Sequence, residues 1–144
     1  MAKLSGQYIN ILLDNASAAA KDISSWCESV EIPQDYQELD VTSFGDGAIN
    51  SIAGMPSAGV EITGGFDPAT GSLYSVAKGV LGASGGTLTV QVGQGAAPTS
   101  GDPEFEGEFW VQKMNLSATP TGKIQLTVSL RPYGTTPAAW GTMT

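Results

Sequence analysis

The chain has 144 residues, of which 14 are acidic and six are basic, and its formal net charge is −8. This length fits one domain with a real hydrophobic core. The acidic excess argues against a protein that grips nucleic acid through phosphate contacts. There is no histidine, which excludes Ser/His and Cys/His catalytic pairs, and the single Cys27 excludes an intramolecular disulfide or a Cys/His zinc site.

Other patterns of chemistry or targeting are also missing. Gly82, Gly85 and Gly86 do not form a phosphate loop, and Glu104, Glu106 and Glu108 alternate along a strand as a solvated row would. No apolar run is long enough for a membrane span, and no basic-then-apolar leader begins the chain. We therefore expect no enzyme activity, no cofactor, no metal and no membrane partner.

The first third of the chain predicts short strands. Tyr8 to Leu13 is rich in β-branched and large apolar residues, which favour a strand. Ala16 to Lys21 is expected to be a loop, followed by a single helical turn at Asp22 to Trp26. Ser29 to Ile32 is a second strand, which ends at Pro33 because proline cannot donate to a ladder.

The stretch from Tyr36 to Phe66 is the part of the chain around which we expect the other elements to be arranged. Its two ends alternate apolar and polar residues as half-buried strands do. The apolar positions are Leu39 and Val41, then Val60 and Ile62, and the polar positions are Glu38, Asp40 and Thr42, then Glu61 and Thr63. We predict two core strands here, joined by a long projecting segment.

That projecting arm spans Ser43 to Gly59 and is mostly small residues. A solvated linker has no use for large apolar side chains, whereas an arm that docks on another subunit does. Asp46-Gly47 is a dipeptide favoured at a two-residue hairpin turn. The predicted docking residues are Phe44, Asp46, Gly47, Ile49, Ile52, Met55 and Pro56.

The remaining elements follow from the same rules. Ser72 to Leu81 predicts one helix, with Ser72 as N-cap and Gly82 just past its end. The other predicted strands are Gly59 to Phe66, Thr87 to Val92, Phe105 to Leu116 with a bulge near Glu108, and Lys123 to Leu130, where Ile124, Leu126, Val128 and Leu130 point inward.

The residues from Pro132 to Thr144 form a tail that contains Tyr133 and Trp140. Two large aromatics in a terminal segment predict that it docks on something. The whole pattern predicts a single domain, residues 1–144, that is mostly β: an antiparallel sandwich or barrel with one short α-helix. Its strands carry few lysines to guard their edges, so edge-to-edge association is a natural outcome.

A family resemblance rests on residues Asp22 to Asp67. The string ELDVTSFGDGAINSIAGMPSAGVEITGGFD resembles the tail tube (major tail) proteins of long-tailed bacteriophages in its order of strand, T-x-F-G-D, small-residue loop, I-x-G and strand ending at F-D. The preceding DISSWCESVEIP is similar to the short D-I-S-x-W turn of that family.

The resemblance implies a virion protein, made in the host cytoplasm, that forms stacked hexameric rings around a channel for DNA. The implied partners are other copies of the chain and the tape measure, terminator and distal tail proteins, with DNA passing without specific binding. A lining of carboxylates with Ser, Thr and Gln would offer DNA no sticking points. The outward-facing candidates for this lining are Glu38, Asp40, Glu61, Glu106, Glu108, Gln125 and Thr127.

Two other functions fit the sequence. A capsid decoration or head-tail connector protein of related fold would bind a preformed lattice. A carbohydrate-binding β-sandwich would use Trp26, Trp110 and Trp140 for stacking, although tryptophans scattered through a chain are more often core or docking residues.

Overall fold

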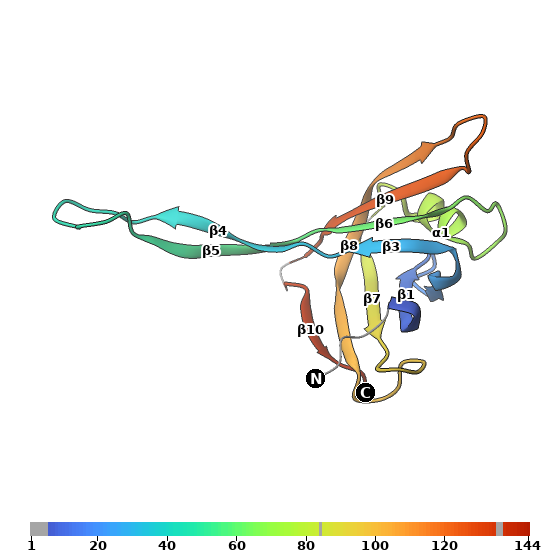
Figure 1. Ribbon diagram of the computed structural model, residues 1–144, viewed down its shortest axis with the longest axis horizontal. Coiled ribbons are helices and arrows are strands. Elements are labelled where there is room, and N and C mark those ends of the chain that lie inside the picture. The colour runs from blue at the N-terminus through green and yellow to red at the C-terminus, as the bar shows by residue number, and fades with distance from the viewer. Residues whose placement is uncertain (1–5, 84, 135–136) are drawn as a thin grey trace.

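A computed structural model describes residues 6–83, 85–134 and 137–144. It consists of a rolled β-sheet and a long two-stranded arm that projects from it (Figure 1). The elements are η1 (Gly6–Tyr8), β1 (Ile9–Asp14), β2 (Ala20–Asp22), η2 (Ser24–Trp26), β3 (Cys27–Glu31), β4 (Gln34–Asp40), β5 (Ser51–Ala58), β6 (Val60–Gly65), α1 (Leu73–Val80), β7 (Gly86–Val92), β8 (Pro103–Ser117), β9 (Gln125–Pro132) and β10 (Ala139–Thr142).

The main sheet is antiparallel and has the strand order β2-β1-β7-β8-β9-β6-β3, with β10 added beside β8. β8 is long enough to join two halves of this sheet. Its residues 104–109 pair with β7 and its residues 109–117 pair with β9. In Figure 1, β7 and the adjoining part of β8 run steeply across β9, β6 and β3. We call the two parts the β7 half (β1, β7, β10 and residues 103–109 of β8) and the β9 half (residues 111–117 of β8, β9, β6 and β3).

The core lies between these two halves. Alternate residues of β1, β6, β7, β8 and β9 point into it, and Phe105 and Phe109 lie there in a tilted arrangement with ring centroids 6.1 Å apart. Burying a side chain of this size contributes about 1.5–3 kcal/mol. The buried apolar residues are Ile11, Leu13, Ile23, Ala58, Val60, Ile62, Leu73, Val76, Ala77, Leu88, Val90, Phe105, Phe109, Val111, Leu126, Val128 and Leu130.

The predicted helix forms as its sequence indicates. Ser72 is its N-cap, and the Ser72 hydroxyl accepts a hydrogen bond from the Ser75 N–H at 3.2 Å. Leu73, Val76 and Ala77 face the core from one side of the helix. Gly82 follows with φ of 74°, a left-handed conformation that glycine adopts readily. No helix in the described part of the chain is long and apolar enough to span a membrane.

Four local predictions were wrong in detail. Residues Ala20 and Lys21, expected in a loop, belong to β2 and pair with β1. The bulge in β8 lies between Val111 and Lys113, not near Glu108. Ile124, expected inside, precedes β9 and is 43% exposed. The expected core strand around Leu39 and Val41 is part of the arm, because β4 is exposed along its whole length.

Candidate assembly surfaces

The arm, defined as residues 34–58, is formed by β4 and β5 and is longer than the sequence predicted. Its strands pair with each other and with no other strand among the described residues. The described residues include twelve exposed large apolar side chains, of which seven are on the arm: Tyr36, Leu39, Val41, Phe44, Ile49, Ile52 and Met55. A soluble monomer rarely exposes a large continuous set of such side chains, so the arm has the composition of a docking surface.

The distal part of the arm has two different faces. Leu39 is paired with Ile52, and Val41 lies two residues beyond Leu39 on the same face. On the opposite face Glu38 is paired with Ala53, and Asp40 with Ser51. The alternation that predicted a core strand is therefore real, but its apolar face is open instead of covered by the body of the same chain.

The tip of the arm is held by Asp46. The backbone N–H of Asp46 donates to the Ser43 carbonyl at 3.1 Å, and its carboxylate accepts from the Ser43 N–H at 2.8 Å. Gly45 takes φ of 96° in this turn, so the left-handed residue is Gly45 and the predicted Asp46-Gly47 turn was wrong. The turn leaves Phe44 fully exposed and Ile49 largely exposed to solvent.

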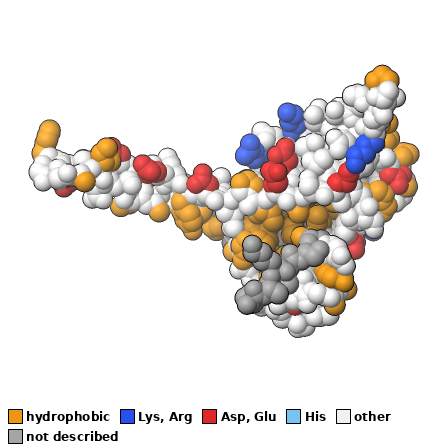
Figure 2. Space-filling view, viewed as in Figure 1, with side chains coloured by type: hydrophobic (Ala, Val, Ile, Leu, Met, Phe, Trp, Pro, Cys, Tyr) orange, Lys and Arg blue, Asp and Glu red, His pale blue; other side chains and the backbone are white. Residues whose placement is uncertain are grey.

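The arm is also acidic. It carries Asp35, Glu38, Asp40 and Asp46 and contains no Lys or Arg, so it holds half of the net charge of −8. The Thr42 backbone N–H donates to the Asp40 carboxylate at 2.9 Å, and this bond lowers the pKa of Asp40. Figure 2 shows acidic and apolar side chains along the arm, with basic side chains only on the body.

Two strand edges of the β9 half are unpaired in the described residues. β3 pairs only with β6, and residues 112–117 of β8 pair only with β9. The β9 half is thus a four-stranded sheet with an open edge at each side. Leu81, Leu116 and Ile124 are exposed in its neighbourhood. Open edges with nearby apolar side chains are suited to pairing with another chain.

The structure divides the predicted channel-lining residues among three places. Glu38 and Asp40 lie on the arm, Glu106 and Glu108 lie on the outer face of the β7 half, and Glu61, Gln125 and Thr127 lie on the outer face of the β9 half. The register pairs Thr63 with Thr127, and Gly65 with Gln125. Because the two halves cross, these outer faces point in different directions.

The two outer faces differ in charge. On the β7 half, carboxylates are bound to neighbouring side chains: Thr87 Oγ1 donates to Glu108 at 2.8 Å, and Gln91 Nε2 donates to Glu104 at 3.0 Å. On the β9 half, the outward residues of β9, β6, β3 and residues 113–117 are mostly Ser, Thr, Asn and Gln. The outward acidic residues Glu31 and Glu61 are equal in number to the outward basic residues Lys113 and Arg131, so the charges on this face nearly cancel.

The C-terminal aromatics dock within the chain itself. β10 pairs with β8, and the Trp140 ring packs on Phe105 with centroids 5.4 Å apart. The Trp140 indole N–H donates to the Gln34 side-chain oxygen at 2.8 Å. Tyr133 donates its backbone N–H to the Glu108 carbonyl at 2.9 Å, and its ring lies so close to Gly85 that a Cβ there would be 2.6 Å from it.

The tryptophans have separate partners. Trp26 donates its indole N–H to the Asp67 carboxylate at 2.9 Å, and Trp110 lies across from Arg131 on the outer face of β8. Among the described residues, no two tryptophans form a ring contact with each other. This arrangement does not single out a sugar-stacking platform.

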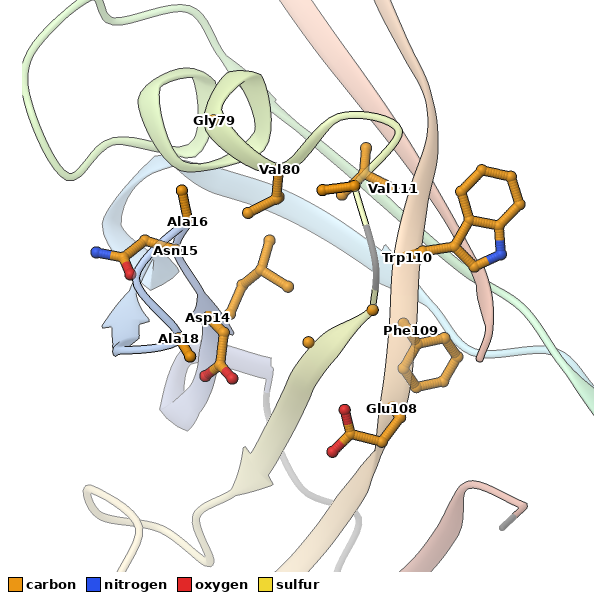
Figure 3. A pocket seen from close by; sticks show the side chains of 14 residues that line it. Asp14, Asn15, Ala16, Ala18, Gly79, Val80, Glu108, Phe109, Trp110 and Val111 are labelled. Carbon is orange, nitrogen blue, oxygen red and sulfur yellow. The ribbon is translucent and has the colours of Figure 1, made fainter. Parts of the chain in front are cut away.

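A cavity of about 310 Å³ lies between the end of α1, the β1–β2 turn and β8 (Figure 3). Asp14 and Glu108 contribute carboxylates to its wall. Both already accept hydrogen bonds from Thr87, one from its N–H and one from its hydroxyl. No group of three or more His, Cys, Asp or Glu in the described residues could hold a metal ion.

Sequence reasoning missed the open edge of β8 and the contact of Gln34 with Trp140. The edge depends on where β7 stops pairing, which the pattern of a single strand does not reveal. Gln34 carried no signal of its own, because a polar residue after a proline is typical of any loop.

No protein-family model and no curated protein matches the sequence. Solved structures match the fold. A chain from the tail of an empty gene transfer agent particle, computed with helical refinement and C6 symmetry, has a TM-score of 0.73 at 18% identity, over 99% of this chain and 100% of that one.

Two further structures are similar. The SPP1 tail tube, determined by solid-state NMR and cryo-EM, has a TM-score of 0.72 at 11% identity, over 92% of this chain and 77% of that one. A chain of the sheath/tube terminator structure of an extracellular contractile injection system (PVC) has a TM-score of 0.69 at 10% identity, over 98% of both chains. At these identities the likeness concerns the fold, and it confirms the predicted mostly-β fold and, at the level of the fold, the resemblance to tail tube proteins.

Proposed function

We propose that this chain is a structural subunit of a phage-type tail tube, which assembles into stacked rings around a channel. The observation that carries the proposal is the arm, a ribbon of residues 34–58 whose apolar face is uncovered by the described chain. The full-length likeness to chains of tail and tube assemblies supports it. The function is structural, and no step of catalysis is part of it.

Ring formation is assigned to the two open edges of the β9 half. The edge of β3 in one copy pairs with residues 112–117 of β8 in the next, so the contact is heterologous and closes only if the rotation between copies completes a circle. The C6 symmetry of the gene transfer agent tail makes six copies the expected number. In this ring the four-stranded sheets of all copies form one continuous wall.

The channel lining then comes from the outer face of the β9 half. Thr63, Gln125, Thr127 and Ser129 lie on that face, together with Glu61. Their hydroxyls and amides are uncharged and do not hold phosphates as cations do, and the basic side chains that lie on this face are Lys113 and Arg131. On this proposal Glu106 and Glu108 lie away from the channel, and so do Glu38 and Asp40, which lie on the face of the arm opposite Leu39 and Ile52.

Stacking is assigned to the arm. Phe44, Ile49, Ile52, Met55 and Leu39 are covered when the arm lies on a subunit of the adjacent ring. The acidic face of the arm, with Glu38 and Asp40, then remains toward solvent. The tube passes DNA without specific binding, and its further partners are the tape measure, terminator and distal tail proteins of the same virion, all assembled in the host cytoplasm.

The experiment is electron microscopy of the purified protein in negative stain, with and without the arm. The intact chain is expected to form long tubes. A variant in which residues 41–50 are replaced by a two-residue Asn-Gly turn shortens the arm at its tip and is expected to remain folded without forming tubes. Tubes of normal length from the shortened chain would refute the role of the arm.

A second candidate is a tube terminator or head-tail connector, which the likeness to the terminator structure favours. Such a protein forms a single ring and caps an existing tube. Isolated rings from the intact chain at high concentration would support this candidate over the tube subunit.

A further inference from the structure

The arm joins the body where both of its strands are interrupted. The break between β3 and β4 is Ile32-Pro33, and the break between β5 and β6 is Gly59. These breaks lie opposite each other, because the Gly59 N–H donates to the Pro33 carbonyl at 3.2 Å. Pro33 has no N–H, and glycine restricts the backbone least of all residues. We call this pair of breaks the arm root.

One side-chain bridge crosses from the C-terminal strand to the arm just beyond the root. The Trp140 indole N–H donates to the Gln34 side-chain oxygen at 2.8 Å, over a sequence separation of 106 residues. Trp140 is fixed at its other end, because its register partner is Phe105 and its ring packs on that fully buried ring. The bridge therefore ties the arm to the core of the body.

A cavity of about 240 Å³ separates the arm base from the C-terminal segment, and its walls include Tyr36, Pro56, Pro132, Ala138 and Trp140. Close packing against the C-terminal segment would hold the arm base through many van der Waals contacts. Atoms that line a cavity lack such contacts on the side that faces the cavity. The Trp140–Gln34 bridge thus adds a side-chain tie at the arm root to the backbone hydrogen bond between Gly59 and Pro33.

We propose that Trp140 is a positioning residue for the arm: through Gln34 it holds the arm root in one direction, and without it the arm swings about Pro33 and Gly59. This inference rests on the proposed function for its purpose, since an arm with a fixed direction can meet the adjacent ring without first being ordered. The swing itself is a property of a single chain and is measurable without assembly.

The test measures the distance between two spin labels in dilute, unassembled protein. Labels at Ala48→Cys, an exposed residue near the tip, and at Lys78→Cys on α1, in a Cys27→Ser background, report the direction of the arm. Loss of one neutral hydrogen bond shifts the ratio of fixed to released arms roughly three- to tenfold. Both Trp140→Phe, which keeps a ring over Phe105, and Gln34→Ala, at an exposed residue, are therefore expected to broaden the distance distribution.

Trp26→Phe is the matched control. It also removes an indole hydrogen bond, the one to Asp67, but at a place remote from the arm. Its distribution is expected to equal that of the parent protein. Unchanged distributions in both Trp140→Phe and Gln34→Ala would overturn the proposal, as would equal broadening in the Trp26→Phe control.

A rescue variant tests the root. A Cβ on Gly59 would meet the Arg131 guanidinium at 3.5 Å and the Leu130 carbonyl at 3.8 Å, which are ordinary contacts. Gly59→Ala therefore fits and restricts the backbone. Added to Trp140→Phe, it is expected to narrow the distribution again, and no narrowing would contradict Gly59 as a pivot. If the intact chain formed no tubes but the spin-label distances changed as expected, only the proposed function would be refuted.

Discussion

Leu39 of β4 lies directly opposite Ile52 of β5, and both side chains face solvent, at 40% and 54% exposure. A cross-strand apolar pair of this kind normally packs on a core. Here no described residue of the body covers it. In the proposed tube, this pair is part of the surface that another copy covers.

The first prediction concerns this pair. Leu39→Thr with Ile52→Thr keeps the β-propensity and removes apolar area. Because both residues are exposed, the free energy of unfolding is expected to change by only about 0.5 kcal/mol. Tube formation, measured by sedimentation and electron microscopy, is expected to be lost. Glu38→Gln on the opposite face is the control, and it should assemble normally; tubes from the double variant would exclude this face from the contact.

The second prediction tests which edges meet in the ring. Ser29 of β3 and Asn115 of β8 are exposed, and each lies on an unpaired edge of the β9 half. Ser29→Lys with Asn115→Lys places like charges on both edges, so rings are expected to fail while the monomer stays folded. Ser29→Lys with Asn115→Glu makes the edges complementary and is expected to restore rings. Equal assembly of the two double variants would show that these edges do not meet.

Much of the body could be predicted from sequence, but the role of the arm strands could not. Val128 and Leu130 alternate with polar residues and are buried as expected, and Leu73, Val76 and Ala77 have helical spacing. Leu39 and Val41 show the same alternation and are exposed. The alternation of apolar and polar residues shows that one face of a strand is apolar. It does not show whether the same chain or another chain covers that face.

The bulge in β8 shows a similar limit. Phe105, Phe109 and Val111 share one parity, and Met114 and Leu116 share the other, so one extra residue must lie between the two groups. The structure places it between Val111 and Lys113. The predicted channel-lining residues lie on different faces for a related reason. Glu61 and Glu106 both point outward, but the crossing of the two sheet halves sets the directions in which they point. That crossing is a property of the whole fold.

The third prediction uses Cys27, whose pKa is raised to about 12 by burial, with a smaller contribution from Asp22. The unfolded thiol ionises near its ordinary pKa of 9.0. The folded chain therefore binds the proton more tightly between these values, and the stability from this group is present below pH 9 and falls as the pH rises toward 12. Thermal melts should show this decline in the parent protein.

Cys27→Ser is the variant that isolates this effect. Serine keeps a donor for the Ile23 carbonyl, which Cys27 Sγ contacts at 3.1 Å, and it does not ionise in this range. The parent minus variant difference in melting temperature is expected to shrink with pH above 9. A constant difference would mean that Cys27 does not contribute to the alkaline decline.

The last prediction concerns the channel face. DNA carries one charge per roughly 1.7 Å of axis, so each ring of added cations creates a set of phosphate contacts. Glu61→Lys with Thr127→Lys changes the outer face of the β9 half, where the two residues lie on neighbouring strands. Tubes should still form, because neither residue is buried, and DNA ejection from particles that carry them should slow, most strongly at low salt. Glu106→Lys with Glu108→Lys, on the β7 half, adds two lysines on the other face and should leave ejection unchanged. Slowing by this second pair alone would place the β7 half on the channel and move the ring contact away from β3 and β8.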